Sequence, residues 1–122
     1  MGKNIVICDD AEFMKQVLRD ILTEAGYNIV GIANNGKEAC SLYKEQTPDL
    51  MIMDINMPQM DGLETLKAIR KMDKNALIVM CSSMNQPKMV MDTLRYGAKD
   101  FIIKPFQKQR VLEVVMNTIG EP

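Results

Sequence analysis

Five side chains that could carry chemistry stand directly after short apolar runs of this sequence. Asp9 and Asp10 follow one run, and Asp54, Ser82 and Lys104 each follow another. Three carboxylates brought together would repel one another by roughly 4 kcal/mol per pair at about 4 Å and an intermediate dielectric. The set therefore favours a bound cation, and all-oxygen ligands suit a hard divalent ion such as Mg²⁺.

A site of this composition predicts phosphoryl chemistry. The Asp54 carboxylate can attack phosphorus and form an aspartyl phosphate. We expect Asp10 to hold Mg²⁺ beside the phosphoryl oxygens, and Asp9 to hold metal-bound water. Lys104 and the Ser82 hydroxyl can bind the remaining phosphoryl oxygens. The added charge would require the segment around Ser82 to move, which makes the site a switch.

The composition removes other mechanisms. The chain has 122 residues, a formal net charge of −1 and no histidine, which excludes Ser-His-Asp and Cys-His nucleophile pairs and histidine-bearing zinc sites within it. A near-neutral chain is not expected to bind nucleic acid. No apolar run is long enough to span a membrane and no signal peptide is evident. The three cysteines lack metal-binding spacing, so we expect buried, reduced thiols and a cytoplasmic protein.

The elements that must position these residues alternate along the whole chain. Apolar runs predict buried strands, and segments with apolar residues at helical spacing predict helices between them. We expect strands at residues 5–8, 29–33, 50–53, 76–81 and 101–103. We expect helices at residues 12–25, 37–46, 63–69, 87–96 and 107–119. The pattern predicts an α/β fold, (βα)5, with a parallel sheet covered on both faces and one domain over residues 1–122.

The candidate residues all stand at the carboxyl ends of predicted strands, where open parallel sheets bind ligands. If the strand order is 2-1-3-4-5, the first, third, fourth and fifth strands are neighbours. Their carboxyl ends would then form one rim. The candidate side chains would meet there.

The sequence resembles the receiver domain of two-component response regulators. The matching segments are residues 7–10, 49–58, 61–62 and 101–106, together with Ser82, and they span nearly the whole chain. The resemblance implies a flavodoxin-like three-layer sandwich with a five-stranded parallel sheet in the order 2-1-3-4-5.

The resemblance also implies a role for each residue. Asp54 would be the phosphoacceptor. Asp9 and Asp10 would bind Mg²⁺ with Asp54 and with the backbone carbonyl of Asn56. Activation would need a histidine on another protein, as the phosphoryl donor.

Three residues near the last two strands would respond to the phosphoryl group. Ser82 and Lys104 would bind it, and Phe101 stands where the family has an aromatic residue that swings inward. The Lys104–Pro105 peptide bond would be cis. Phe101 has no hydroxyl, so an output contact that needs a tyrosine hydroxyl is absent.

Within the family, residues 81–86 and 97–107 resemble the single-domain chemotaxis regulators of the non-enteric type. That resemblance implies a monomer that is phosphorylated by a CheA-type histidine kinase, acts on the flagellar motor switch, and is dephosphorylated by a phosphatase. We expect the output surface on the fourth helix, fifth strand and fifth helix, with these residues: Lys88, Met91, Arg95, Lys99 and Lys108.

Several alternatives stay open at this point. The chain could be the receiver domain of a larger regulator outside chemotaxis. A phosphatase with an aspartate nucleophile would expect a second aspartate at position 56, where Asn56 stands, and a flavin carrier would not gather three carboxylates. Glu12 could interact only with the dipole of its helix or could touch metal-bound water.

Overall fold

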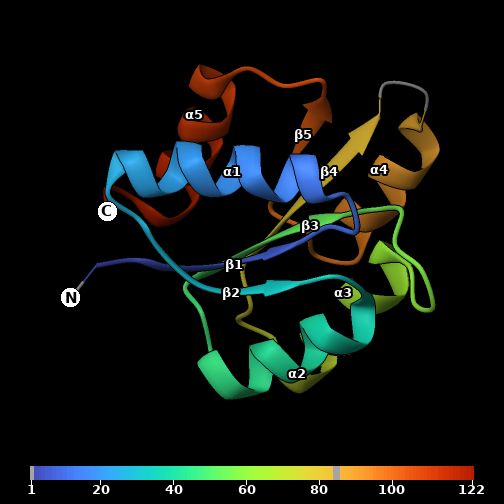
Figure 1. Cartoon of the computed structure of the whole chain (residues 1–122). Coiled ribbons are helices and arrows are strands. Elements are labelled where there is room, and N and C mark those ends of the chain that lie inside the picture. The colour runs from blue at the N-terminus through green and yellow to red at the C-terminus, as the bar shows by residue number, and fades with distance from the viewer. Residues whose placement is uncertain (1, 84–85) are drawn as a thin grey trace.

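Five parallel strands form the central layer of the computed structural model, which describes residues 2–83 and 86–122 (Figure 1). The strands are β1 (Asn4–Cys8), β2 (Asn28–Ala33), β3 (Leu50–Asp54), β4 (Ile78–Ser83) and β5 (Asp100–Lys104). Their order across the sheet is β2-β1-β3-β4-β5, which confirms the order implied by the sequence resemblance. Met84 and Asn85, which belong to the segment 81–86 of that resemblance, lie outside the described residues.

Helices cover both faces of the sheet. They are α1 (Glu12–Ala25), α2 (Gly36–Gln46), α3 (Gly62–Met72), α4 (Pro87–Arg95) and α5 (Lys108–Ile119). In Figure 1, α1 and α5 lie together on one side of the sheet, and α2 and α3 lie on the other. The α/β sandwich with helices on both faces is confirmed.

The alternation of strand side chains gives each face its own core. Leu18 and Leu22 of α1 pack with Val111 and Val115 of α5 on one face. Residues of α2, α3 and α4 pack with the opposite side chains of the same strands. Because successive strand residues point to opposite faces, a residue's parity along its strand decides which core it joins.

Among the strands, β4 departs most from its predicted bounds, whereas the other four differ by one residue at an end or at both ends. Helix α3, predicted at residues 63–69, extends over Gly62–Met72. β4 begins at Ile78 instead of residue 76 and continues through Ser82 and Ser83, which pair with Ile103 and Lys104 of β5. Backbone hydrogen bonds hold this end of the strand, so its polar side chains do not interrupt the pairing. Ser82, whose hydroxyl is a candidate site group, is therefore a residue of the sheet and not of the loop that follows it.

Two of the helices, α2 and α3, begin with side-chain caps. Asp61 accepts a hydrogen bond from the backbone N–H of Glu64 at 2.8 Å, which caps α3 just after the Asp54 loop. Asn35 caps α2 in the same way through Glu38 at 2.9 Å. Such caps stabilise a helix by about 1 kcal/mol each and define where it starts.

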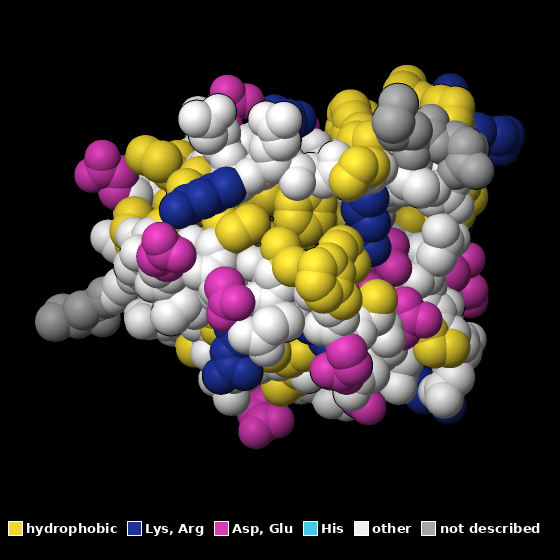
Figure 2. All heavy atoms as spheres, turned by 45° about the horizontal axis from the view of Figure 1, so that its top comes forward, with side chains coloured by type: hydrophobic (Ala, Val, Ile, Leu, Met, Phe, Trp, Pro, Cys, Tyr) yellow, Lys and Arg dark blue, Asp and Glu magenta, His cyan; other side chains and the backbone are white. Residues whose placement is uncertain are grey.

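The surface carries no dominant charge on the face shown in Figure 2, where apolar side chains are interspersed with acidic and basic ones. This agrees with the formal net charge of −1. Among the helices that the structure describes, none has the length and apolar character needed to cross a membrane.

Candidate functional site

Strand parity directs three predicted site residues to one side of the sheet end. Asp9, Asp54 and Lys104 each stand two positions after an isoleucine that packs in the core beneath α1 and α5. Ser82 stands two positions after Met80, which packs in the core on the opposite face. Because side chains alternate along strands, the hydroxyl approaches the rim from the face that carries α4.

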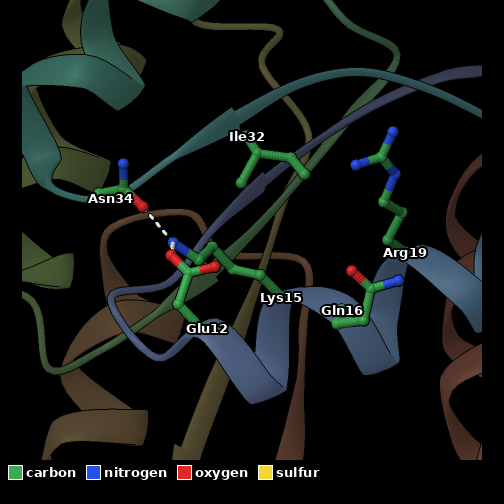
Figure 3. A pocket seen from close by; sticks show the side chains of 6 residues that line it. All are labelled: Glu12, Lys15, Gln16, Arg19, Ile32 and Asn34. Atoms are coloured by element: carbon green, nitrogen blue, oxygen red, sulfur yellow. Dashed lines mark hydrogen bonds and ion pairs between the residues drawn. The ribbon is translucent and has the colours of Figure 1, made fainter.

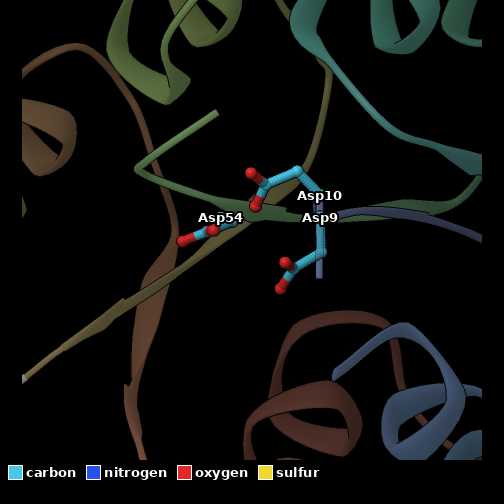
Figure 4. A group of neighbouring side chains, drawn as sticks. All are labelled: Asp9, Asp10 and Asp54. Carbon is cyan, nitrogen blue, oxygen red and sulfur yellow. The ribbon is translucent and has the colours of Figure 1, made fainter. Parts of the chain in front are cut away.

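The register of the sheet brings the carboxyl ends of β1 and β3 side by side. The last residues of β1 pair with β3 up to Cys8 opposite Met53, so the aspartates that follow are neighbours. Asp9, Asp10 and Asp54 each offer one oxygen, and these oxygens lie within 4.8 Å of one another (Figure 4).

The three carboxylates differ in exposure. Asp9 is 1% exposed and Asp54 is 6% exposed, whereas Asp10 is open to solvent. Carboxylate oxygens crowded at one point of the rim are the ligands that hard divalent cations prefer. The residues present therefore fit Mg²⁺.

Lys104 is the cation that faces this cluster. Its Nζ lies 3.0 Å from Asp9 Oδ2 and 3.4 Å from Asp54 Oδ1. Burial alone would lower the pKa of Lys104, but the hydrogen bond to Asp9 and the charges of Asp54 and Asp9 raise it above its usual value. Lys104 is therefore charged at neutral pH and compensates part of the acidic rim.

Burial, rather than the neighbouring charges, dominates the ionisation of Asp54. Burial raises the pKa of its carboxyl, Lys104 lowers it and Asp9 raises it again, and the result is a pKa above the usual range. The Asn56 N–H donates to Asp54 Oδ1 at 3.3 Å. Both this contact and the Lys104 contact engage Oδ1, so neither engages Oδ2.

Asp9 accepts hydrogen bonds on both oxygens. The backbone N–H of Ala11 donates to Oδ1 at 2.9 Å, and Lys104 donates to Oδ2 at 3.0 Å. The first bond fixes the turn that leads into α1, and the second connects β1 to the end of β5. Asp9 is thus held more firmly than the exposed Asp10.

The Ser82 hydroxyl is fully buried at the end of β4. It donates to the carbonyl of Ser83 at 2.9 Å and lies 3.4 Å from Gln86 Oε1. Gln86 carries only a weak signal in the sequence, because a glutamine before a proline suits many loops.

A cis peptide bond follows β5, and an apolar groove lies beside this strand. The cis bond joins Lys104 to Pro105. Phe101 is half-buried and, with Ile103, lines an apolar groove of about 210 Å³ between α4 and β5. Met91 lines the same groove from α4.

The five predicted output residues do not form one cluster. Met91 is in the groove, whereas Arg95 lines a separate hollow toward α3 with Lys67 and Arg70. Lys108 lies 3.4 Å from Glu24 and so faces α1. Of the remaining two, Lys88 pairs with Asp92 at 3.5 Å and Lys99 is exposed in the connection before β5.

Glu12 forms an ion pair with Lys15, a partner that the sequence does not reveal. Its Oε1 lies 2.7 Å from Nζ of Lys15, a side chain only 6% exposed, and Asn34 accepts a second hydrogen bond from the same Nζ (Figure 3). Among the described residues, the carboxylate cluster at the rim does not include Glu12. Glu12 and Lys15 instead connect α1 to the end of β2.

Gly62 is a further residue whose role the sequence left unseen. A Cβ at this position would lie 2.6 Å from the carbonyl oxygen of Asp54 and 2.7 Å from Cα of Ile55. The Gly62 N–H donates to the Ile55 carbonyl at 2.7 Å. Only glycine lets α3 start this close to the loop that follows Asp54.

Comparison with known proteins adds the family. Residues 5–116 match the response regulator receiver domain. The chain is 52% identical to the chemotaxis protein CheY of Thermotoga maritima, covering 94% of this chain and 96% of that protein. It is 50% identical to the chemotaxis protein CheY of Bacillus subtilis, covering 98% of this chain and 100% of that protein.

Solved structures agree with these matches. The CheY of a CheX–CheY–BeF3–Mg²⁺ complex from Borrelia burgdorferi superimposes with a TM-score of 0.90 at 40% identity, covering 94% of this chain and 87% of that one. The response regulator domain of Thermotoga maritima CheB has a TM-score of 0.90 at 31% identity, covering 100% and 99%.

Receiver domains are phosphoryl-accepting switch domains that bind Mg²⁺ at an acidic pocket, and this chain carries an aspartate cluster at the corresponding edge of its sheet. The fold, the carboxylate cluster and the sequence match all indicate the same family, and the match covers nearly the whole chain. The chain therefore belongs to the response regulator receiver domain family and is closely related to the chemotaxis protein CheY.

Proposed function

We propose that this chain is a chemotaxis response regulator that accepts a phosphoryl group on Asp54 and changes its binding to a partner. The observation that carries the proposal is the packing of Asp9, Asp10 and Asp54 within 4.8 Å, with Lys104 3.4 Å from the Asp54 carboxylate. A buried carboxylate beside a lysine and two further acids suits attack on phosphorus and not a structural role.

Each rim residue has a proposed part in the transfer. Asp54 Oδ2, which neither Lys104 nor Asn56 engages, attacks phosphorus of the donor. The bond from phosphorus to the imidazole nitrogen of the donor breaks, and that nitrogen keeps the electron pair. Lys104 then moves its hydrogen bonds toward the phosphoryl oxygens, and Ser82 donates a further one.

Asp10, Asp54 and the Asn56 carbonyl are the proposed direct ligands of Mg²⁺. Asp9 already accepts two hydrogen bonds, which supports a role through metal-bound water. When bound, Mg²⁺ neutralises the charge that develops on the phosphoryl oxygens.

The histidine that this chain lacks belongs to its proposed donor, a CheA-type histidine kinase. The target is the flagellar motor switch, and a phosphatase removes the signal. The CheX named in the Borrelia complex is one candidate for a protein that binds this chain. We propose a monomer that acts as a phosphoryl-accepting switch and catalyses only its own phosphorylation and dephosphorylation.

The proposed output contact is the apolar groove between α4 and β5. Phe101 of β5 and Met91 of α4 both line it, and so does Ser83, which follows Ser82 in β4. A short amphipathic helix from the partner would fit such a groove. Lys88 and Lys99 are exposed on α4 and just before β5, whereas Arg95 and Lys108 face other elements.

Two further points belong to the proposal. Residues 1–122 act as a single receiver domain, which is supported by curated relatives whose length the chain spans almost fully. A cytoplasmic location is supported by three free thiols, Cys8, Cys40 and Cys81.

Intact-mass measurement tests the function. After incubation with Mg²⁺ and acetyl phosphate, the wild-type chain should gain the mass of one phosphoryl group, and Asp54→Ala should gain none. Asp20→Ala, which changes an exposed aspartate of α1, is the matched control and should label like wild type. Failure of the wild type to label, or equal labelling of Asp54→Ala, would contradict the proposal.

A further inference from the structure

Two amide side chains meet across the rim in a reciprocal pair. Asn56 Nδ2 donates to Gln86 Oε1 at 3.0 Å, and Gln86 Nε2 donates back to Asn56 Oδ1 at 3.1 Å. Asn56 stands two residues after the candidate phosphoacceptor, and Gln86 stands directly before α4. The pair therefore joins the loop after β3 to the connection between β4 and α4.

Gln86 also binds the end of β4. Its Oε1 accepts from Ser83 Oγ at 3.1 Å and lies 3.4 Å from Ser82 Oγ. A hydroxyl has one proton to donate, and the shorter contact of Ser82 is to the Ser83 carbonyl at 2.9 Å. In this arrangement the Ser82 proton is used within its own strand end.

The position of Gln86 in its helix makes these contacts informative. It is the N-cap residue of α4, yet its side chain makes no hydrogen bond to the helix that it precedes. A side chain at this position commonly satisfies the first N–H groups of its own helix. Here the amide reaches across the rim instead.

We propose that Asn56 and Gln86 form an amide clamp that holds the Ser82–Ser83 end of β4 in its resting arrangement and so opposes phosphoryl uptake by Asp54. The inference rests on the proposed function. For Ser82 Oγ to donate to a phosphoryl oxygen, it must leave the Ser83 carbonyl. That change moves the strand end to which Gln86 is bonded. Gln86 is thus a positioning residue that acts through Ser82.

Interactions present only in the resting arrangement lower the affinity for any ligand that needs the other one. Removing either amide loses the two hydrogen bonds of the pair, and removing Gln86 also loses the hydrogen bond from Ser83 Oγ. We therefore expect Gln86→Leu and Asn56→Ala each to bind beryllofluoride, with Mg²⁺ present, roughly three- to tenfold more tightly than wild type. The double variant should gain no more than Gln86→Leu alone, because that variant already lacks every contact of the clamp.

NMR titration of the backbone amides of Ser82 and Ser83 measures these affinities, and initial rates of labelling by acetyl phosphate give a second readout. Gln109→Leu, an exposed glutamine of α5, is the matched control and should match wild type. The exchange variant Asn56→Gln with Gln86→Asn preserves both amides and their combined length, so it should return the affinity toward wild type. A purely structural effect of the single changes would not be reversed in this way.

The outcomes separate the clamp from the proposed function. Wild-type protein that binds no beryllofluoride would overturn the proposed function and the clamp with it. Wild-type protein that binds it, alongside single variants of unchanged affinity or additive effects in the double variant, would overturn the clamp alone. Tighter binding in both single variants, reversed in the exchange variant, is the result that the clamp requires.

Discussion

Two properties of the Asp54 side chain oppose each other, its ionisation and its burial. It must be ionised to attack phosphorus, but it is 6% exposed and faces Asp9. Burial and the charge of Asp9 together outweigh the attraction of Lys104, so the pKa of Asp54 is raised. The charged rim therefore weakens the fold at neutral pH, and function rather than stability accounts for it.

Replacing Asp54 by asparagine should stabilise the protein in the absence of Mg²⁺. The folded-state pKa of Asp54 lies above its unfolded value, so the wild type loses stability as the pH rises through the folded value, and the loss is complete above it. At pH 7 the free energy of unfolding of Asp54→Asn should exceed that of wild type by roughly 1–2 kcal/mol. Below the unfolded pKa the two proteins should be nearly equal.

Urea denaturation followed by circular dichroism, with a chelator present, measures this difference. Asp20→Asn changes an exposed aspartate and should leave stability within about 0.5 kcal/mol of wild type. A less stable Asp54→Asn at pH 7 would mean that Lys104 outweighs burial and the Asp9 charge.

The positions of single site residues could be predicted from the sequence where the residue directly follows or ends a strand. The carboxyl ends of parallel strands share one edge, so Asp9, Asp54 and Lys104 could be placed together before any geometry was known. Lys15 and Gln86 could not, because their partners depend on loop conformation. A lysine on an amphipathic helix looks exposed until Asn34 and Glu12 are seen to accept from it.

At the scale of elements, α3 starts where the loop after Asp54 ends. Gly62 lets the first turn of the helix pass against the backbone of that loop. Gly62→Ala would place a methyl group 2.6 Å from the Asp54 carbonyl oxygen, and backbone atoms cannot move aside cheaply. The substitution should therefore displace α3 or the loop that carries Asn56.

We expect Gly62→Ala to lower the free energy of unfolding by about 1–3 kcal/mol and to slow labelling of Asp54 by acetyl phosphate. Gly120→Ala is the control. A Cβ there meets nothing within 4 Å, and the backbone φ of 82° with ψ of −173° costs about 1–3 kcal/mol for a non-glycine residue. The control should lose stability without any change in labelling. Equal labelling rates for Gly62→Ala and wild type would contradict the proposed role of this contact.

The bounds of elements were predicted less well than their order. Hydrophobic runs gave β4 as residues 76–81, whereas pairing with β5 shifts it to Ile78–Ser83. The shift is invisible to hydropathy because Ser82 and Ser83 are held by the backbone of a neighbour distant in sequence. The strand order likewise came from the family resemblance, since an alternating pattern of strands and helices fits more than one order.

Over the whole molecule, the site spans elements that fold together. Rim residues stand at the ends of β3, β4 and β5 and directly after β1, and the two cores lie on opposite faces of the sheet that these strands form. A domain of 122 residues is expected to unfold in one cooperative transition. A ligand at the rim should therefore stabilise the entire fold and not only its own edge.

Millimolar Mg²⁺ should raise the melting temperature of the wild-type chain. The ion neutralises the crowded carboxylates in the folded state, and the unfolded chain has no equivalent cluster, so stability rises as RT ln(1 + [Mg²⁺]/Kd). At a concentration of 100 times Kd this amounts to about 2.7 kcal/mol, or roughly 10 °C for a domain of this size. Differential scanning calorimetry with and without a chelator measures the shift.

Asp10→Asn removes the exposed carboxylate and should abolish most of the shift, whereas Asp20→Asn should retain it. An unshifted wild type, or an equal shift in Asp10→Asn, would show that the acidic rim is not where the ion binds.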